Sequence, residues 1–541
     1  MADGAQSIES QAAVADYDVV VVGAGLGGIY ALHRFRAQGL RVLGLEGAAG
    51  VGGVWFHNRY PGARVDVDSL DYCYYFSPEI FREWTWSERF ATQPELLRYL
   101  NFVADRLELK PLIQFETWLS AAQWHPERAE WELTTSTGTR CRTRFLVMAT
   151  GNLSAARKPN FAGLDDYQGE WVQTSHWPDR DIPFVGRRIA VIGTGSSGVQ
   201  SIPVIAEQAE HLYVFQRSPN YSVPAWNGPV DQAVYADLRS RVPEARKAMF
   251  ATAGATNFMV PSPPFAEFDE AGAQARLEWQ WGKGGHGMSY LFSDQGRDRD
   301  TNTVVAEFVR SKIRGIVKDP ALAEKLCPYD HPIGSRRLCL DTGYYETFNR
   351  PNVTLVDVRE DPIERITKTG IKTRDGSYDV DLIVFALGFH PFTGAWDRIE
   401  IRNAKGAGPT DHWKAGPKTL LGLMTTGFPN FFFLSGPGSP SVLANLFLMN
   451  EYHVDWVGEL IAHMDRAGYR TVEPTDDAQE KWSAHVAEVA APTLRLRTLN
   501  YMVHRNPDGS GVFIPYIGGF MRYAEQADAI AASGYEGFAF N

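Results

Sequence analysis

The chain has 541 residues, of which 44% are hydrophobic and 22% charged, as in ordinary globular proteins with room for several domains. Its formal net charge of −11 argues against nucleic acid or an anionic membrane as a partner. The four cysteines include no close pair, so we expect neither a disulfide framework nor a metal site. Residues 1–16 lack the features of a signal peptide, and no apolar run approaches the ~18 residues that cross a bilayer. We therefore expect a cytoplasmic protein.

The first predicted strand, over residues 19–22, runs directly into a glycine-rich turn, residues 23–28. In such a turn the first glycine permits the bend, the second lets a pyrophosphate approach the backbone, and the third allows close helix–strand packing. The next strand ends at Glu46, whose carboxylate can accept from ribose hydroxyls and repels a 2′-phosphate. These features predict an FAD or NAD site with the glycines Gly23, Gly25, Gly27 and Gly28.

A second turn of the same kind follows the strand over residues 189–192. The strand after it ends in Arg217 and Ser218 and carries no acid. A guanidinium matches a phosphate in charge and in forked geometry, so this site should take NADP. We assign to it Gly193, Thr194, Gly195, Ser196, Ser197, Gly198 and Gln200 as well. Two such turns suggest two dinucleotides, one of which passes electrons to the other.

Two buried strands that end in glycine turns, residues 145–151 and 382–388, are places where the chain can leave a domain and return. We therefore predict an α/β fold in which one Rossmann-like domain, for NADP, is inserted into another, for FAD. The residues between them include a polar stretch of helical period, which predicts a helical insertion. The expected parts are a disordered tail (1–16), the FAD domain (17–150 and 389–541), the NADP domain (151–223 and 333–388) and the insertion (224–332).

The segment 52–66, GGVWFHNRYPGARVD, carries a resemblance to a known family. At every defined position it resembles a motif of type I Baeyer–Villiger monooxygenases, flavoproteins that convert ketones to esters or lactones. The likeness covers nearly the whole chain and looks closest to the branch that acts on phenylacetone and steroid ketones. It implies that FAD contacts Gly53, Val54, Trp55, Asp66, Tyr72, Leu119 and Leu446, and that Arg64 and Arg336 bind NADP.

The resemblance also implies a catalytic pair. Arg337 matches the family's catalytic arginine and supplies a charge that does not titrate at working pH, and Asp66 matches its partner. In that family NADPH reduces FAD, oxygen forms a C4a-peroxyflavin, and the peroxide attacks the ketone. The same oxygenated flavin oxidises sulfides. The expected cofactors are thus FAD and NADPH, and the expected partners are O2 and a ketone or sulfide.

Two positions depart from the family's pattern. The fingerprint Phe-x-Gly-x-x-x-His-x-x-x-Trp-Pro keeps Gly169 and Trp177, but Gln173 replaces the histidine and cannot carry its charge. We place Gln173 on an extended interdomain linker, where it should weaken the coupling of domain motion to oxygenation. Weaker coupling should lead the enzyme to release hydrogen peroxide beside the product. Asn500 stands where the family has a tryptophan that closes over NADP. Either the pocket is more open there, or the loop is rearranged.

Other function classes share parts of this pattern. A heteroatom-hydroxylating flavin monooxygenase has both nucleotide folds but should lack the complete 52–66 motif. A weakly coupled NADPH oxidase stays open because of Gln173 and Asn500. The absence of a close cysteine pair disfavours a disulfide reductase. A redox-inactive flavin-binding protein would need a defective turn or arginine, and the sequence has neither.

Overall fold

The computed structural model describes residues 15–257 and 262–541. Residues 1–14 of the predicted tail lie outside the described residues. Asp16, at the end of that predicted tail, is held by the body of the protein: its Oδ2 accepts a hydrogen bond from the Arg142 amide at 2.9 Å, and its neighbour Ala15 is buried. The folded part of the described chain therefore includes Asp16, the last residue of the predicted tail.

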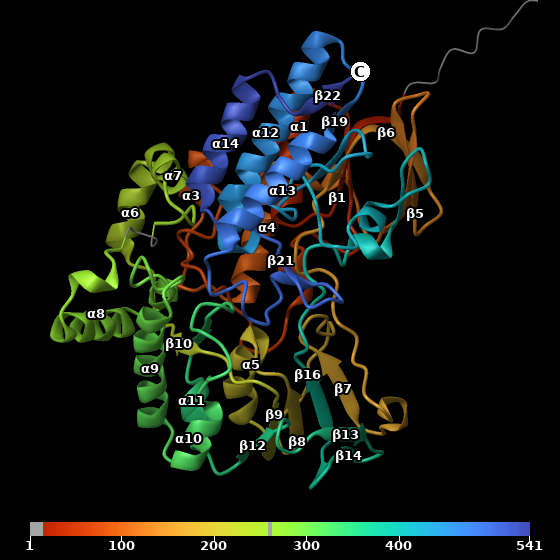
Figure 1. Cartoon of the computed structure of the whole chain (residues 1–541). Coiled ribbons are helices and arrows are strands. Elements are labelled where there is room, and N and C mark those ends of the chain that lie inside the picture. Colours follow the sequence, from red (N-terminus) through yellow and green to blue (C-terminus); the bar gives the residue numbers. More distant parts are fainter. Residues whose placement is uncertain (1–14, 258–261) are drawn as a thin grey trace, which may run out of the picture.

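The first sheet has eight strands and contains the strand that leads into the first glycine turn (Figure 1). Its strands are β1 (Tyr17–Val22), β2 (Val42–Leu45), β3 (Ile113–Gln114), β4 (Leu119–His125), β5 (Glu130–Thr135), β6 (Arg140–Met148), β17 (Glu400–Arg402) and β18 (Phe431–Phe433). Strands β18, β6, β1, β2 and β3 are joined by parallel pairing, while β4 and β5 form an antiparallel extension. Apart from β3, whose Gln114 is exposed, the apolar runs of the parallel strands are buried on both faces.

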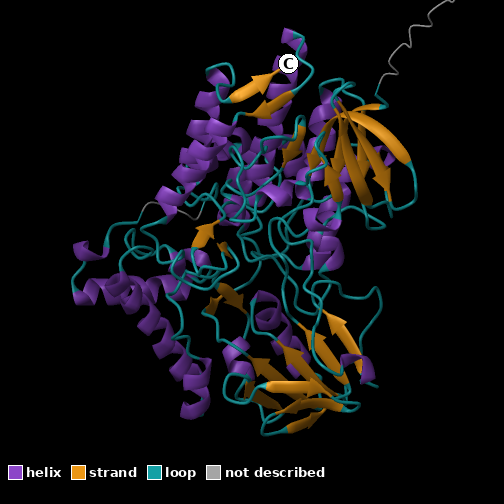
Figure 2. Ribbon diagram, turned by 45° about the vertical axis from the view of Figure 1, so that its right-hand side comes forward, coloured by secondary structure: helices purple, strands orange, loops and turns teal. Residues whose placement is uncertain are grey.

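The second sheet has five strands, all parallel, in the order β12-β9-β8-β16-β7. They are β7 (Glu170–Gln173), β8 (Arg188–Ile192), β9 (His211–Gln216), β12 (Val353–Asp357) and β16 (Leu382–Phe385). These strands lie between residues 170 and 385, whereas the first sheet takes strands from both sides of that range. Figure 2 shows the two sheets as separate bodies joined by loops. The predicted α/β class with two Rossmann-like sheets is confirmed, and the exact domain boundaries stay predictions.

Three helices support the two glycine turns. They are α1 (Leu26–Ala37), α5 (Ser196–Ala206) and α12 (Leu446–Ala467). Helix α1 begins at the first turn and packs on α12, while α5 begins at the second turn and packs on β8 and β9. Each turn thus sits at a strand end and a helix N-terminus, which is the position that binds phosphate in nucleotide folds.

The described part of residues 224–332 is largely helical and lies to one side of the two sheets (Figure 1). The helices are α6 (Gln232–Ser240), α7 (Val242–Phe250), α8 (Glu270–Lys283), α9 (Arg299–Ile316) and α10 (Pro320–Leu326). An aspartate begins four of them and accepts hydrogen bonds from amides of the first turn, as a good N-cap does: Asp231, Asp269, Asp298 and Asp319.

The remaining α-helices and strands complete the described chain. The helices are α2 (Val54–His57), α3 (Pro78–Glu83), α4 (Gln93–Arg106), α11 (Tyr344–Thr347), α13 (Asp476–Ala490) and α14 (Phe520–Ala532). The strands are β10 (Ser222–Pro224), β11 (Cys339–Asp341), β13 (Ile363–Ile366), β14 (Gly370–Thr373), β15 (Ser377–Asp379), β19 (Val472–Pro474), β20 (Val503–Arg505), β21 (Gly511–Phe513) and β22 (Phe538–Phe540). No helix within 15–257 and 262–541 has the length and apolar character needed to cross a membrane.

Helix α12 carries a fully buried histidine, His453. Its Nδ1 accepts a hydrogen bond from the Ser435 amide at 3.1 Å. Its Nε2 lies 2.9 Å from the Tyr523 hydroxyl, which itself donates to the Leu421 carbonyl, so Nε2 carries the proton. Burial lowers the pKa of His453 to about 3, and the imidazole is neutral in the folded protein.

We expect this histidine to make stability depend on pH. Below about pH 6.5 the unfolded chain binds a proton at His453, whereas the folded chain takes it up only near the lowered pKa of about 3. The free energy of unfolding should therefore decrease as the pH is lowered below about 6.5, by up to about 1.4 kcal/mol per pH unit from this residue. His453→Gln, which can keep both hydrogen bonds, should flatten the profile between about pH 6 and 4. Parallel melting profiles of the two proteins would contradict this assignment.

Candidate active site

The first glycine turn leaves space for backbone only. Gly23 has φ of +105°, and a Cβ there would lie 2.6 Å from the Ala149 carbonyl oxygen. A Cβ at Gly28 would lie 1.8 Å from the Gly23 carbonyl oxygen. Opposite the turn, Gly53 has φ of +57° and approaches Gly25 so closely that a Cβ would stand 3.1 Å from its Cα. The geometry fits a dinucleotide pyrophosphate held against the N-terminus of α1.

The predicted ribose acceptor lies beside this turn. Glu46 follows β2, and its two carboxylate oxygens accept hydrogen bonds from the amides of Ala24 at 2.7 Å and Ala48 at 2.8 Å. Burial raises the pKa of Glu46, while these backbone amides oppose the rise. Leu119, predicted near the adenine, begins β4 and is buried. A carboxylate so fixed at the strand end suits a ribose without a 2′-phosphate.

Aromatic residues predicted along the flavin lie together. Trp55, which follows Val54 in α2, donates through Nε1 to the Tyr72 hydroxyl at 3.3 Å. The ring of Tyr72 also meets Phe447 edge to face at 4.8 Å. Leu446 precedes Phe447 at the start of α12. The structure thus brings the motif at 52–66 against the C-terminal part of the chain, as a flavin site shared between them requires.

The second turn repeats the first with one difference. A Cβ at Gly193 (φ +113°) would lie 2.4 Å from the Ala386 carbonyl oxygen, and one at Gly198 would lie 2.2 Å from that of Gly193. A Cβ at Gly195 would meet no atom within 4 Å, so the N-terminus of α5 faces open space. Thr194 Oγ1 donates to the Ser218 carbonyl at 3.1 Å. A second pyrophosphate fits here.

Helix α5 contacts the flavin-side motif directly. Gln200 accepts from the Tyr60 hydroxyl at 2.8 Å and donates to the Arg64 carbonyl at 3.1 Å. Earlier in the helix, Ser196 Oγ lies 3.6 Å from the Cys339 sulfur, and Ser197 follows it. The predicted NADP residues of α5 therefore lie where the two nucleotide modules meet.

The predicted cations of the NADP site differ in their surroundings. Arg217 is exposed and has no ion pair within the described ranges. Ser218 Oγ donates to Asp330 Oδ2 at 3.1 Å, and Arg336 Nη2 lies 3.5 Å from the same oxygen. Arg64 is paired with Glu88 at 3.2 Å, so its guanidinium is already engaged. Ser218 and Arg336 are brought together, and the role of Arg64 stays a prediction.

The proposed catalytic pair forms a bidentate ion pair across the chain. Arg337 Nε lies 2.6 Å from Asp66 Oδ2, and Nη2 lies 2.7 Å from Oδ1. Arg337 Nη1 also donates to the Val442 carbonyl at 3.2 Å. Arg337, which follows the insertion, therefore connects the 52–66 motif through Asp66 with the loop before α12 through Val442.

Electrostatics keep both members of the pair charged. Burial alone would raise the pKa of Asp66, but the charge and hydrogen bonds of Arg337, with a smaller contribution from the nearby His286, hold it well below its usual range. Burial likewise opposes the charge of Arg337, while Asp66 raises the pKa of the guanidinium. A fixed positive charge of this kind stabilises an oxyanion in a partly desolvated site.

A pocket opens beside this pair, lined by Arg337 itself. Sequence reasoning missed two of its residues, His286 and Tyr501. His286 Nε2 lies 3.5 Å from Asp66 Oδ2, and burial lowers the pKa of the imidazole, so it stands neutral beside the ion pair. The glycine-rich break at 282–287 is the only signal near His286, and it does not indicate contact with Asp66. Other residues lining the pocket are Thr256, Tyr290, Arg336, Arg337, Val442 and Asn445.

The linker position predicted for Gln173 is wrong. Gln173 is the last residue of β7 and pairs with Phe385 of β16, and its Nε2 donates to the Arg157 carbonyl at 2.8 Å. The chain then turns back, so His176 bonds to the Gln173 carbonyl and stacks on His57 with centroids 5.0 Å apart. A four-residue strand at a sheet edge gives too short an apolar pattern to be recognised.

The fingerprint's other residues flank this turn. Gly169 directly precedes β7, and Trp177 donates its amide to the His57 carbonyl at 3.2 Å. Through His57 the turn therefore touches the flavin-side motif. Burial lowers the pKa of His57 to about 4, with smaller contributions from His176 and Arg59. Gln173 thus lies close to a contact between the two modules, although not on an extended linker.

The side chain of Asn500 is engaged within its own loop. The Asn500 side chain donates to the carbonyls of Arg495 and Thr498 and accepts from the Met502 amide, all within its own loop. Tyr501, and not Asn500, lines the pocket beside Arg337. Asn500 thus satisfies its own backbone, and both interpretations of the missing tryptophan, a more open pocket and a rearranged loop, stay predictions.

Comparisons with known proteins agree with this arrangement. Residues 16–226 match the model of the flavin-binding monooxygenase-like family. The chain is 37% identical to a Baeyer–Villiger monooxygenase of Pseudooceanicola batsensis, over 96% of each chain. It is 39% identical to the phenazine N-monooxygenase PhzNO1 of Lysobacter antibioticus, again over 96% of each. Among solved structures, an oxidised steroid monooxygenase bound to NADP is 48% identical with a TM-score of 0.92, covering 97% of this chain and 99% of that one. The chain therefore belongs to the flavin-binding monooxygenase-like family, within its Baeyer–Villiger branch.

Proposed function

We propose that the chain is an FAD- and NADPH-dependent Baeyer–Villiger monooxygenase. It would convert a ketone, O2, NADPH and a proton into an ester or lactone, NADP+ and water. The observation that carries the proposal is the bidentate Asp66–Arg337 pair at a pocket where two phosphate-binding modules meet. We assign the first turn to FAD and the second to NADP, and we place the enzyme in the cytoplasm, where NADPH is supplied.

The chain's own residues have defined tasks in this reaction. The bound flavin supplies the activation of O2 by electrons from NADPH. Asp66 orients the Arg337 guanidinium through two hydrogen bonds, and the Val442 carbonyl fixes a third nitrogen. Arg337 then holds a positive charge where the ketone oxygen gains negative charge during attack. Tyr501 and His286 line the pocket and limit the entry of water.

A second candidate function is oxidation of a heteroatom, at nitrogen or sulfur. A relative of comparable identity is named for N-oxidation, although that name describes the relative's activity. The complete 52–66 motif and the Asp66–Arg337 pair favour ketone oxidation as the main activity, with sulfoxidation beside it. Weak coupling, with release of hydrogen peroxide, is the third outcome to measure.

The decisive experiment is NADPH consumption by the purified FAD-loaded enzyme with a panel of ketones, sulfides and aromatic amines. Oxygenated products and hydrogen peroxide are both quantified. Ester or lactone formation from at least one ketone class would support the proposal. Turnover of amines or sulfides alone would assign the chain to heteroatom oxidation, and peroxide without any product would make it an oxidase.

Cofactor preference gives a prediction of its own. Arg217→Ala should raise the KM for NADPH by about tenfold and leave that for NADH within about twofold, because a guanidinium contributes only where the 2′-phosphate is present. Steady-state kinetics with both cofactors measure this directly. Arg374→Ala is the matched control, since that exposed arginine pairs with Asp375 elsewhere in the same module. An equal rise in the KM for NADPH and for NADH would show that Arg217 does not bind the 2′-phosphate.

A further inference from the structure

An acidic residue, Asp330, lies between Ser218 and Arg336, two residues predicted to bind NADP, of which Ser218 directly follows Arg217. Asp330 Oδ2 accepts a hydrogen bond from Ser218 Oγ at 3.1 Å, and the same oxygen lies 3.5 Å from Arg336 Nη2. Its other oxygen faces His331 Nδ1 at 2.6 Å. A carboxylate therefore already uses the hydroxyl and the guanidinium that a phosphate would need.

The carboxylate is charged at neutral pH. Burial works against its ionisation, but the hydrogen bond from His331, the charge of Arg336 and the bond from Ser218 hold the pKa of Asp330 below its usual range. The neighbouring imidazole does not neutralise it, since burial and Arg336 lower the pKa of His331. A 2′-phosphate entering here meets a negative charge that competes for the same donors.

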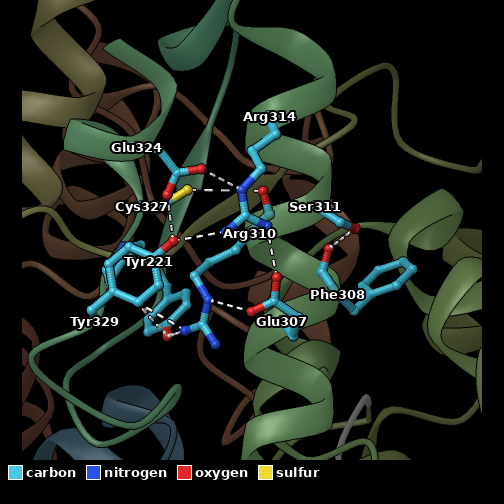
Figure 3. A network of polar contacts seen from close by, with 10 residues as sticks. Tyr221, Glu307, Phe308, Arg310, Ser311, Arg314, Glu324, Cys327 and Tyr329 are labelled. Atoms are coloured by element: carbon cyan, nitrogen blue, oxygen red, sulfur yellow. Dashed lines mark hydrogen bonds and ion pairs between the residues drawn. The ribbon is translucent and has the colours of Figure 1, made fainter. Parts of the chain in front are cut away.

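The backbone before Asp330 is held firmly by the network drawn in Figure 3. From helix α9, Arg310 Nη1 donates to the Pro328 carbonyl at 3.1 Å and to the Tyr221 hydroxyl at 2.8 Å, and Tyr221 donates to the same carbonyl. Arg314, one turn later, donates to the Tyr329 hydroxyl at 2.7 Å. The segment that carries Asp330 is thereby anchored to α9, so the carboxylate can leave the two donors mainly by rotation of its own side chain.

We propose that Asp330 occupies the 2′-phosphate position while the NADP site is empty and lowers the affinity for NADPH relative to NADH. The proposal rests on the proposed function, because it takes the second turn as the NADP site. On binding, the phosphate displaces the carboxylate from Ser218 and Arg336, and Arg217 adds its own charge from the exposed side. On release, Asp330 recaptures both donors and favours departure of NADP+.

The test is the affinity of the FAD-loaded enzyme for two fragments, measured by titration calorimetry without any turnover. Adenosine 2′,5′-bisphosphate carries the 2′-phosphate, and adenosine 5′-monophosphate lacks it. Asp330→Asn keeps the shape of the side chain and removes its charge. We expect this variant to bind the bisphosphate about tenfold more tightly and the monophosphate within about twofold of the unmodified enzyme. A residue that merely supported the site would weaken binding when altered.

Asp357→Asn is the matched control. It removes one negative charge at the end of the neighbouring strand β12, where Asp357 pairs with Arg359 and not with Ser218 or Arg336. An equal gain in both variants, weaker bisphosphate binding in Asp330→Asn, or an equal change for both fragments would each overturn the proposal. If the unmodified enzyme binds the two fragments equally, the NADP site itself is misassigned. If it prefers the bisphosphate and Asp330→Asn brings no gain, only the role of Asp330 fails. Flavin content and melting temperature confirm that each variant is folded.

Discussion

Replacing Arg337 with alanine is expected to abolish ester formation while FAD stays bound. The change removes the charge that faces the pocket and leaves Asp66 without its bidentate partner. Loss of a preorganised charge at a developing oxyanion costs about 10²- to 10³-fold per donor, so product formation should fall at least that far. Chromatography of the products, flavin absorbance and stopped-flow reduction by NADPH measure the three properties separately.

Two further variants sharpen the result. Arg337→Lys keeps the charge but not the forked geometry, so we expect partial activity. Asp66→Asn should lower product formation as well, because the guanidinium loses its orienting carboxylate although its charge remains. Undiminished ketone turnover in Arg337→Ala would exclude the mechanism, whereas loss of flavin would show a structural role.

Gly28→Ala should produce a protein that fails to retain FAD. A Cβ at this position would lie 1.8 Å from the Gly23 carbonyl oxygen, and both partners are backbone that cannot move aside without distorting the turn. We expect a loss of stability of about 3 kcal/mol or more, in the range of the severe point mutations. Flavin absorbance after gel filtration and the melting temperature report the two effects.

Gly282→Ala provides the control for this substitution. It lies in helix α8, where an added Cβ meets no atom within 4 Å. Alanine also favours the helix by about 1 kcal/mol, so flavin content should be unchanged and the melting temperature equal or higher. Full FAD retention by Gly28→Ala would show that the turn can rearrange and that its close packing is not required.

The local part of the molecule could be predicted from the sequence. The glycine turns at 23–28 and 193–198 lie where expected, because strand, turn and helix are contiguous in sequence. Each turn also needs glycines at positions where a Cβ would clash with the backbone, and these are visible in the sequence. The split of the first sheet was also predictable, from two apolar strands that end in similar turns. The contact of Asp66 with Arg337 followed from the family resemblance, and spacing alone does not indicate it.

The remainder depends on contacts between residues far apart in the chain. His286 reaches Asp66 through the packing of the insertion, and no periodicity in either segment encodes that distance. The position of Gln173 at the end of a strand could not be predicted, because the two residues between Gln173 and His176 decide whether the chain continues or reverses. The place of Tyr501 at the pocket could not be predicted, because it depends on hydrogen bonds of the Asn500 side chain within its own loop. Loop conformation at these places follows from local hydrogen bonds that a pattern does not reveal.

The pairing of β18 with β6 has a consequence for synthesis on the ribosome. Phe431–Phe433 completes the flavin-side sheet, yet β6 ends at Met148, so the two partners are made roughly 280 residues apart. At about 5–20 residues per second, the nascent β6 waits on the order of 15–60 s with an unpaired apolar edge. The inserted module can fold during that interval, while the outer one cannot close. Chaperone protection of the nascent chain should therefore matter more for the flavin-side module, and FAD can be captured only late in synthesis.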